Sequence, residues 1–142
     1  MKIREVQIED YVQTKELHEK YNLKILNKIE WSRLWFENPT TFDANSYFPK
    51  GWVIEENKKI VCYLGNLAKE YYYKNKKFIV TCSHSWVAES NYRLQALSLC
   101  YLLLLFIKSN SSDSSGAART APVIAVGAIT STGPSVAAVN LP

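Results

Sequence analysis

The residues best able to do chemistry in this chain lie between positions 84 and 98. His84 has an imidazole, whose unperturbed pKa falls near neutral pH, so it can take up or release a proton. Glu89 to Asn91 are residue types that suit turns and helix N-caps, and helix formers follow them. Arg93 adds a permanent positive charge beside this predicted helix start. The segment therefore combines a titratable side chain with a place suited to an anion.

A helix that starts near Asn91 predicts a phosphate site at its first turn. The first N–H groups of a helix have no partner within the helix, and the positive end of the helix dipole lies at the same place. A phosphate can be held there by backbone geometry, with the Arg93 guanidinium beside it.

The element before this turn is a predicted strand from Phe78 to Val87, in a run rich in β-branched and aromatic residues. Strict alternation places one set of side chains on a single face: Phe78, Val80, Cys82, His84 and Trp86. Neither face is fully polar, so we expect both to be covered by other elements. The apolar run that follows, up to Ile107, predicts a long core helix.

The rest of the chain provides the elements that must support this strand and helix. Upstream, the pattern predicts a strand, two helices and a loop, over Lys2–Ile8, Tyr11–Tyr21, Leu23–Glu37 and Thr40–Lys50, with Asp10 as a helix N-cap. Two further strands, Trp52–Glu55 and Lys59–Lys69 with its continuation to Tyr73, complete a three-stranded antiparallel meander with the strand from Phe78. Gly65 within the second of these predicts a bulge or a close approach of another group.

This order of elements, together with the segment WVAESNYRLQALSLCYLL from Trp86, resembles the GCN5-related N-acetyltransferase (GNAT) family. The resemblance implies an α+β fold with an N-terminal strand and two helices, a central antiparallel meander, and a long helix packed on the sheet. It covers about Ile3 to Lys108 as an order of elements.

The resemblance also implies acetyl-CoA as co-substrate. By position, the strand end that pairs with the pantetheine arm is Trp86, Val87 and Ala88, and the pyrophosphate loop is Arg93, Leu94, Gln95, Ala96, Leu97 and Ser98. Both glycines of the family's loop are replaced here, by Ala96 and Ser98, which stay small but lose the freedom of glycine at positive φ. Because both are small, we expect Ala96→Leu to block the ligand while leaving the fold intact.

The implied reaction is acetyl transfer by direct attack of an amine on the thioester. It needs a base for the ammonium proton, donors for the oxyanion and an acid for the thiolate. His84 is the first candidate for the base, and Glu89 and Glu70 are alternatives. Cys82 shares a face with His84, but no third, orienting residue is visible to make them a nucleophilic pair. The implied acceptor is a small-molecule or peptide amine.

The composition changes after Lys108. Residues 1–108 are the expected GNAT-like core, whereas the Ala/Ser/Val-rich tail, 109–142, is either the family's next strand-and-helix region or an aberrant segment. The tail contains no Tyr to protonate the thiolate, and the family's final strands have no counterpart. We therefore expect the chain to be the N-terminal part of a longer member.

Two other functions remain open at this stage. The replaced glycines and the missing Tyr would also fit a catalytically inactive GNAT-like interaction module. A hairpin that interleaves Tyr71, Tyr72 and Tyr73 with lysines could bind single-stranded nucleic acid. Its lysines are Lys58, Lys59, Lys69, Lys74, Lys76 and Lys77. A sheet edge protected by lysines explains the same pattern, so nucleic acid is not expected as a partner.

Composition also bears on net charge, metal binding and cellular location. A net charge of +4 is only mildly basic. Three cysteines match no zinc spacing, which predicts buried thiols in a reducing compartment and no metal. The N-terminus lacks the apolar region of a secretory signal, and Ala96–Ile107 is, at twelve residues, too short to cross a bilayer. We expect a cytoplasmic protein without a membrane partner, and the sequence leaves its oligomeric state open.

Overall fold

The computed structural model describes residues 1–41 and 47–111 of the 142-residue chain. Its strands are β1 (Lys2–Glu5), β2 (Gly51–Glu56), β3 (Lys59–Tyr73) and β4 (Lys76–Ala88). Its helices are α1 (Tyr11–Lys20), α2 (Lys28–Trp35) and α3 (Arg93–Ser111), with short 3-10 helices η1 (Ile8–Asp10), η2 (Pro39–Thr41) and η3 (Ser90–Tyr92). The expectations for the tail from 112 onward lie outside the described residues.

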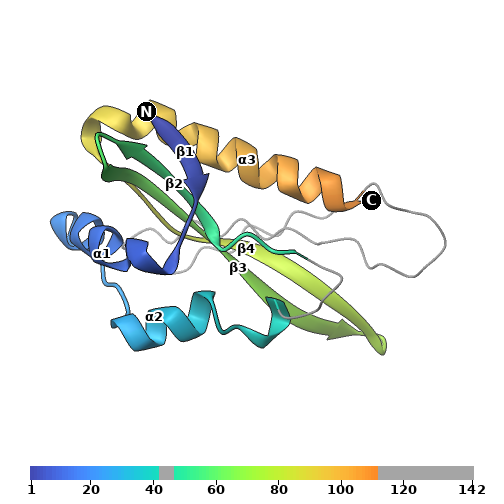
Figure 1. Ribbon diagram of the computed structural model, residues 1–142. Coiled ribbons are helices and arrows are strands. Elements are labelled where there is room, and N and C mark those ends of the chain that lie inside the picture. The colour runs from blue at the N-terminus through green and yellow to red at the C-terminus, as the bar shows by residue number, and fades with distance from the viewer. Residues whose placement is uncertain (42–46, 112–142) are drawn as a thin grey trace.

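The four strands form one antiparallel sheet in the order β1-β2-β3-β4 (Figure 1). Both tight turns have two central residues at positive φ, Asn57 and Lys58 at 49° and 64°, and Lys74 and Asn75 at 47° and 61°. Positive φ at both positions defines the type I′ turn, whose twist matches that of a hairpin. The predicted meander is therefore confirmed, with both turns at the predicted positions.

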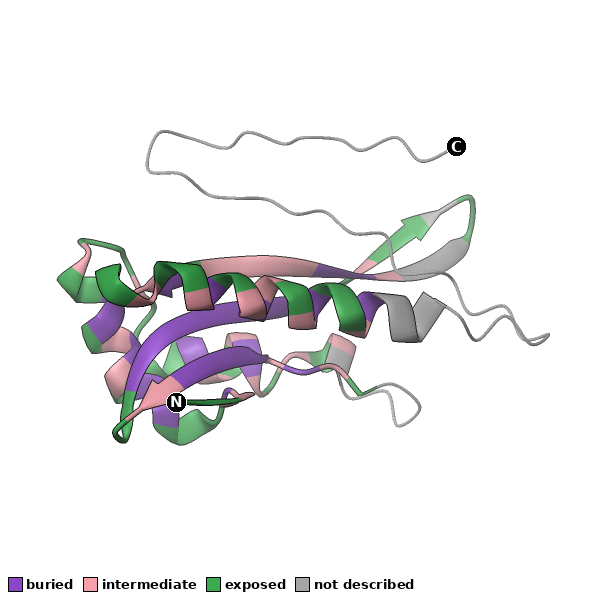
Figure 2. Cartoon of the chain, turned by 90° about the horizontal axis from the view of Figure 1, so that it is seen from above, coloured by how far each residue is buried: buried purple, intermediate pink, exposed green. Residues whose placement is uncertain are grey.

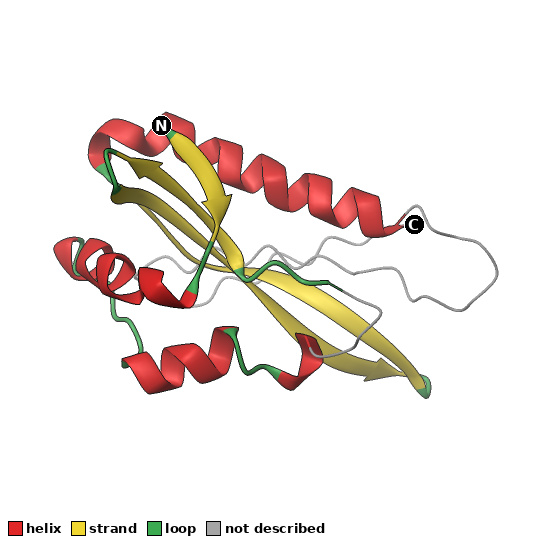
Figure 3. Ribbon diagram, viewed as in Figure 1, coloured by secondary structure: helices red, strands yellow, loops and turns green. Residues whose placement is uncertain are grey.

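Helices cover the sheet on both faces, with α1 and α2 on one side and α3 on the other (Figures 1 and 3). The core accordingly has two parts. The α1/α2 side contains Val6, Tyr11, Leu17, Trp31, Trp35, Val53, Ile60, Tyr63, Leu67 and Val87. The α3 side contains Trp52, Ile54, Val61, Cys62, Leu64, Ala96, Leu99, Leu103 and Ile107. Both faces of β2 and β3 are therefore buried, which agrees with the apolar run from Ile60 to Leu64 in β3.

Two upstream predictions need correction. The second helix is shorter than Leu23–Glu37, because it begins at Lys28 with Asn27 as its N-cap, whose side chain accepts a hydrogen bond from the Glu30 N–H at 3.0 Å. Asp10 does not cap α1 with its side chain. Its carboxylate is used instead by Arg4, which explains why it is buried.

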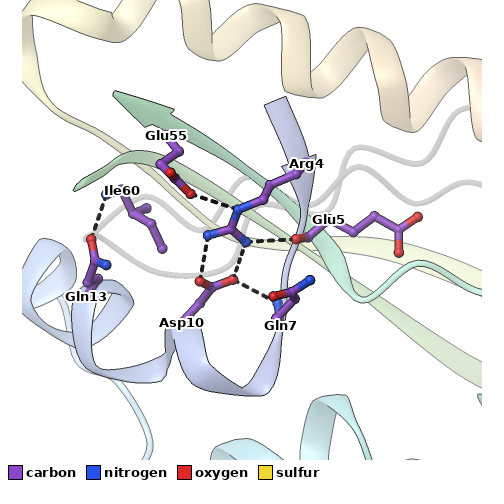
Figure 4. Close-up of polar contacts among 7 residues, drawn as sticks. All are labelled: Arg4, Glu5, Gln7, Asp10, Gln13, Glu55 and Ile60. Atoms are coloured by element: carbon purple, nitrogen blue, oxygen red, sulfur yellow. Dashed lines mark hydrogen bonds and ion pairs between the residues drawn. The ribbon is translucent and has the colours of Figure 1, made fainter. Parts of the chain in front are cut away.

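Arg4 joins β1 to its neighbours through a small ionic network (Figure 4). Its guanidinium donates to both oxygens of Asp10, at 2.7 and 2.8 Å, and to Glu55 at 2.9 Å. The hydrogen bond to Asp10 is the main reason that the pKa of Arg4 is raised. Gln13 on α1 accepts a hydrogen bond from the Ile60 N–H of β3 at 2.8 Å. These contacts fix the start of α1 against the edge of the sheet.

The β3–β4 pairing contains a bulge that changes which side chains share a face. Gly65 pairs with His84 and Tyr63 with Val87, so β4 has one residue more than β3 over this interval. His84 and Val87 both face α1 and α2, since His84 packs against Trp35 and Val87 belongs to the core on that side. The predicted strict alternation up to Trp86 is therefore wrong beyond His84.

The long helix α3 has 19 residues and is therefore longer than its most apolar segment suggested. An 18-residue window, Ser90–Ile107, has a mean hydropathy of 1.2, so its length and composition would suit a membrane span. The inner side of the helix packs on the sheet through Ala96, Leu99 and Leu103, whereas its outer side is exposed (Figure 2). The prediction that the segment is too short to cross a bilayer is therefore wrong. Only 22% of this window is buried, and α3 packs on the sheet along one side alone.

Candidate functional site

The turn between β4 and α3 is the centre of the candidate site. The Glu89 N–H donates to the Val61 carbonyl at 2.8 Å, and the Tyr92 N–H donates to the Glu89 carbonyl at 2.9 Å. The helix thus begins as η3 at Ser90 and becomes α-helical at Arg93, close to the predicted start near Asn91. The Tyr92 N–H is therefore already paired within the turn, and η3 leads directly into α3.

Glu89 joins this turn to the end of α1. Its carboxylate accepts hydrogen bonds from Lys20 at 2.5 Å and from the Tyr21 hydroxyl at 3.0 Å. The same hydroxyl accepts the Ser90 N–H at 3.0 Å. The hydrogen bond from Lys20 is the main cause of the lowered pKa of Glu89. A carboxylate of lowered pKa is a weaker base, so this geometry suits Glu89 to holding the turn in place.

A cleft of about 630 Å³ opens beside this turn. It is lined by Lys20, Tyr21, Glu56, Asn57, Lys59, Val61, Glu89, Ser90, Asn91 and Tyr92. The two lysines are drawn toward Glu89, with Lys59 at 3.9 Å from its other oxygen. Their charge is therefore partly compensated within the protein.

The six residues of the predicted pyrophosphate loop do not all face solvent. Arg93, Leu94 and Leu97 are exposed, whereas Ala96 is 1% exposed and packs in the core under α3. The expectation that Ala96→Leu would leave the fold intact is therefore wrong, because a larger side chain would be forced into the packed core.

The two uncharged polar side chains of this loop, Gln95 and Ser98, differ in their hydrogen bonding. The Ser98 hydroxyl donates to the Gln95 carbonyl at 2.5 Å, so it is held along the helix. The Gln95 Oε1 atom is buried and has no hydrogen-bond partner within the described part of the chain. Arg93 is thus an exposed cation of this turn.

The strand end Trp86–Ala88 has one paired edge. Val87 pairs with Tyr63 and Ala88 with Cys62 of β3, while no strand among residues 1–41 and 47–111 pairs with the other edge of β4. An unpaired strand edge offers N–H and C=O groups to an extended ligand. Trp86, at 47% exposed, flanks this edge.

His84 lies on β4 three residues before Val87. Its ring packs edge-on against Trp35, with 5.8 Å between ring centroids, and its Nδ1 lies 2.5 Å from the Ser85 hydroxyl oxygen. Burial, with a smaller effect of the Lys69 charge, lowers its pKa. The lowered pKa favours the neutral ring, which can accept a proton, and it also makes His84 a weaker base than a free imidazole.

Gly65 leaves room for the Trp35 ring and the His84 carbonyl to approach closely. A Cβ atom at residue 65 would lie 2.6 Å from the Trp35 ring and 2.7 Å from the His84 carbonyl oxygen. The predicted close approach at Gly65 is thus confirmed. Glu70, the third candidate base, pairs with Ile79 in the distal part of the hairpin, so the structure does not bring it together with the turn.

Several residues of the site were missed from the sequence. Lys20 and Tyr21 are almost 70 positions from Glu89, and no local pattern connects them. Ser85 is next to His84 in the sequence, but the expected alternation of side chains along a strand predicted that the two would lie on opposite faces of the sheet.

The cysteines form neither a disulfide nor a metal site within the described residues, and nucleic-acid binding by the Lys–Tyr hairpin stays a prediction. All three cysteines are free, and only Cys62 is fully buried, which raises its pKa to about 11. Within the described residues no group of three or more His, Cys, Asp and Glu could hold a metal ion. Tyr71 and Tyr72 are exposed on the hairpin, beside Glu70 as well as Lys69.

No protein-family model matches the sequence, and no curated protein matches it. Solved structures do match. A glucosamine-6-phosphate N-acetyltransferase from Arabidopsis thaliana is 19% identical, with a TM-score of 0.55 over 87% of this chain and 80% of that one. A GCN5-related N-acetyltransferase from Kribbella flavida is 10% identical, with a TM-score of 0.56 over 92% of this chain and 31% of that one. The NatB acetyltransferase complex bound to CoA and MES is 20% identical, with a TM-score of 0.51 over 72% of this chain and 62% of that one.

These similarities, joined to the element order and the sheet topology, establish the fold but not the activity. The α+β architecture predicted from the sequence is confirmed: the chain has the fold of the GCN5-related N-acetyltransferases.

Proposed function

We propose that this chain serves as an acyl-CoA-dependent N-acyltransferase of the GCN5-related family, acting in the cytoplasm. The observation that carries the proposal is the direct passage from a strand edge at Trp86–Ala88, with which no strand of the described residues pairs, to a helix start marked by the exposed Arg93. An extended arm that ends in a pyrophosphate needs these two features side by side.

In this proposal the Arg93 guanidinium holds the pyrophosphate of acetyl-CoA. The Ser90 and Tyr92 N–H groups already donate to the Tyr21 hydroxyl and the Glu89 carbonyl, so the pyrophosphate would take up one of these amides only by displacing its present partner. The pantetheine arm runs back along the free edge of β4, beside Trp86, Val87 and Ala88. Leu94, Gln95, Ala96, Leu97 and Ser98 continue the first turns of the helix, and of these Ala96 acts from the core side by keeping the helix close to the sheet. One structural neighbour, the NatB complex, is described as bound to CoA.

The acyl group is then transferred by direct attack of an amine on the thioester carbonyl. His84 takes the proton from the attacking ammonium group, a task that suits a ring kept neutral by burial. Glu89 stays a carboxylate and holds the turn through Lys20 and Tyr21, so its contribution is to position the backbone. The acceptor is a small-molecule or peptide amine.

Calorimetric titration of the full chain with acetyl-CoA and with CoA tests the proposal. We expect both ligands to bind at one site per chain. Absence of binding at millimolar ligand, with a chain shown to be folded by circular dichroism, would contradict it.

A further inference from the structure

Ser85 has a backbone conformation that is uncommon within a strand. Its φ is +57°, in the left-handed region, and it lies in the bulge between the pairs Gly65–His84 and Tyr63–Val87. Neighbouring residues of a regular strand point to opposite faces of the sheet. Here the bulge brings the Ser85 hydroxyl oxygen to 2.5 Å from Nδ1 of the preceding residue, His84.

A serine hydroxyl hydrogen-bonded to an imidazole nitrogen is the first part of the arrangement that activates serine as a nucleophile, and here ring packing takes the place of a third polar residue in orienting the imidazole. Two contacts support the ring in this position. Trp35 packs edge-on against it, and Gly65 leaves the space that this packing requires. Both side chains of the pair are partly exposed, so a reacting group can approach them. Backbone strain at such a position is typical of functional sites.

Acetyl-CoA, bound as proposed above, would be the acyl donor for Ser85. This part of the argument therefore rests on the proposed function. Ser85 directly precedes Trp86–Ala88, the residues beside which the pantetheine arm would lie. An arm that enters at Arg93 and runs back along β4 brings its thioester toward the bulge.

We propose that Ser85 is itself an acyl acceptor, so that the protein acetylates its own Ser85 from acetyl-CoA when no amine is bound. The Oγ atom forms a bond to the thioester carbonyl carbon while Nδ1 of His84 takes the hydroxyl proton. The carbon–sulfur bond then breaks, and the CoA thiolate leaves with the proton from His84. The products are acetyl-Ser85 and free CoA, and no oxidant or further reactant is needed.

Intact-mass measurement and peptide mapping after incubation with acetyl-CoA test this proposal. We expect one acetyl group per chain, located on Ser85. Ser85→Gly removes the hydroxyl and suits the left-handed backbone, so it should fold and carry no acetyl group. His84→Ala should slow acetylation of Ser85 by about 10²-fold or more. Ser83→Ala, two residues away on the same strand, is the matched control and should be acetylated as the wild type is.

Binding of acetyl-CoA, measured separately by calorimetry, separates this proposal from the proposed function. If acetyl-CoA binds and Ser85 stays unmodified, or if the acetyl group maps to a lysine, the proposal is overturned. If acetyl-CoA does not bind, p-nitrophenyl acetate replaces it as a donor that needs no CoA site. Acetylation of Ser85 by this ester that depends on His84 then supports the pair, and an unmodified Ser85 overturns it.

Discussion

The two halves of the β3–β4 hairpin have the same strands but different surroundings. The proximal half, from Lys59 to Gly65 and from His84 to Ala88, lies between α1/α2 on one face and α3 on the other. The distal half extends beyond the last β2–β3 pair, Gly51–Gly65, as a two-stranded arm (Figure 3). All the contacts that define the candidate site are in the proximal half. The difference indicates that coverage on both faces, and not the hairpin alone, fixes the position of His84 and of the turn before α3.

Truncation of Leu99 should have the largest effect on stability. Leu99 is fully buried against the proximal half, so Leu99→Ala should lower the free energy of unfolding by about 2–5 kcal/mol. Tyr72→Ala in the distal half, at 70% exposed, should change it by less than about 0.5 kcal/mol. Urea unfolding of both variants measures the difference. Equal losses would show that the two halves are covered alike.

Gly65→Ala should also destabilise the protein, by about 1–3 kcal/mol, because the added methyl group would collide with Trp35 and the His84 carbonyl. It should shift the imidazole resonances of His84 in NMR spectra as well. Ser83→Ala on the neighbouring strand serves as the control and should leave these resonances unchanged. An unaffected His84 in Gly65→Ala would mean that Gly65 does not set the position of the ring.

Arg93→Ala should weaken binding of acetyl-CoA by about 1–3 kcal/mol, because it removes a charge-assisted contact to phosphate. Its free energy of unfolding should stay unchanged, since Arg93 is exposed. Arg33→Ala removes an equally exposed arginine from α2 on the opposite side of the sheet, and it should bind as the wild type does. Calorimetric titration of both variants with acetyl-CoA measures the difference. Equal weakening in the two variants would mean that net charge, and not a contact of Arg93 with the ligand, accounts for the loss.

The smallest predicted effect is the pH-dependent contribution of Glu89 to the free energy of unfolding. Its folded-state pKa is lowered, chiefly by Lys20, so its contribution to stability is present above its ordinary pKa of 4.5 and is lost as pH falls through the folded value. An ion pair this close to the surface contributes at most about 1 kcal/mol. Glu89→Gln should therefore be less stable than the wild type at pH 7, with a smaller gap at pH 3. A gap that is the same at both pH values would contradict this.

Much of the fold was accessible from the sequence because its signals are local. The type I′ turns at Asn57 and Lys74, the apolar run of β3 and the helix start after Glu89 each follow from neighbouring residue types. The bulge at Ser85 was not accessible, because it depends on the pairing of two strands. Likewise, burial of Ala96 depends on how α3 rotates on the sheet. The contacts of Lys20 and Tyr21 with Glu89 arise from segments far apart in the chain, which residue spacing cannot reveal.

The most direct test of the central claim is amide chemical-shift mapping of the ¹⁵N-labelled chain during titration with CoA. If the turn from β4 to α3 is the ligand site, the largest shifts should fall at Trp86–Ala88 and at Arg93–Leu97, with little change at the distal tip around Lys74 and Asn75. Shifts concentrated at that tip or on α2, or no shifts at saturating CoA, would contradict the account.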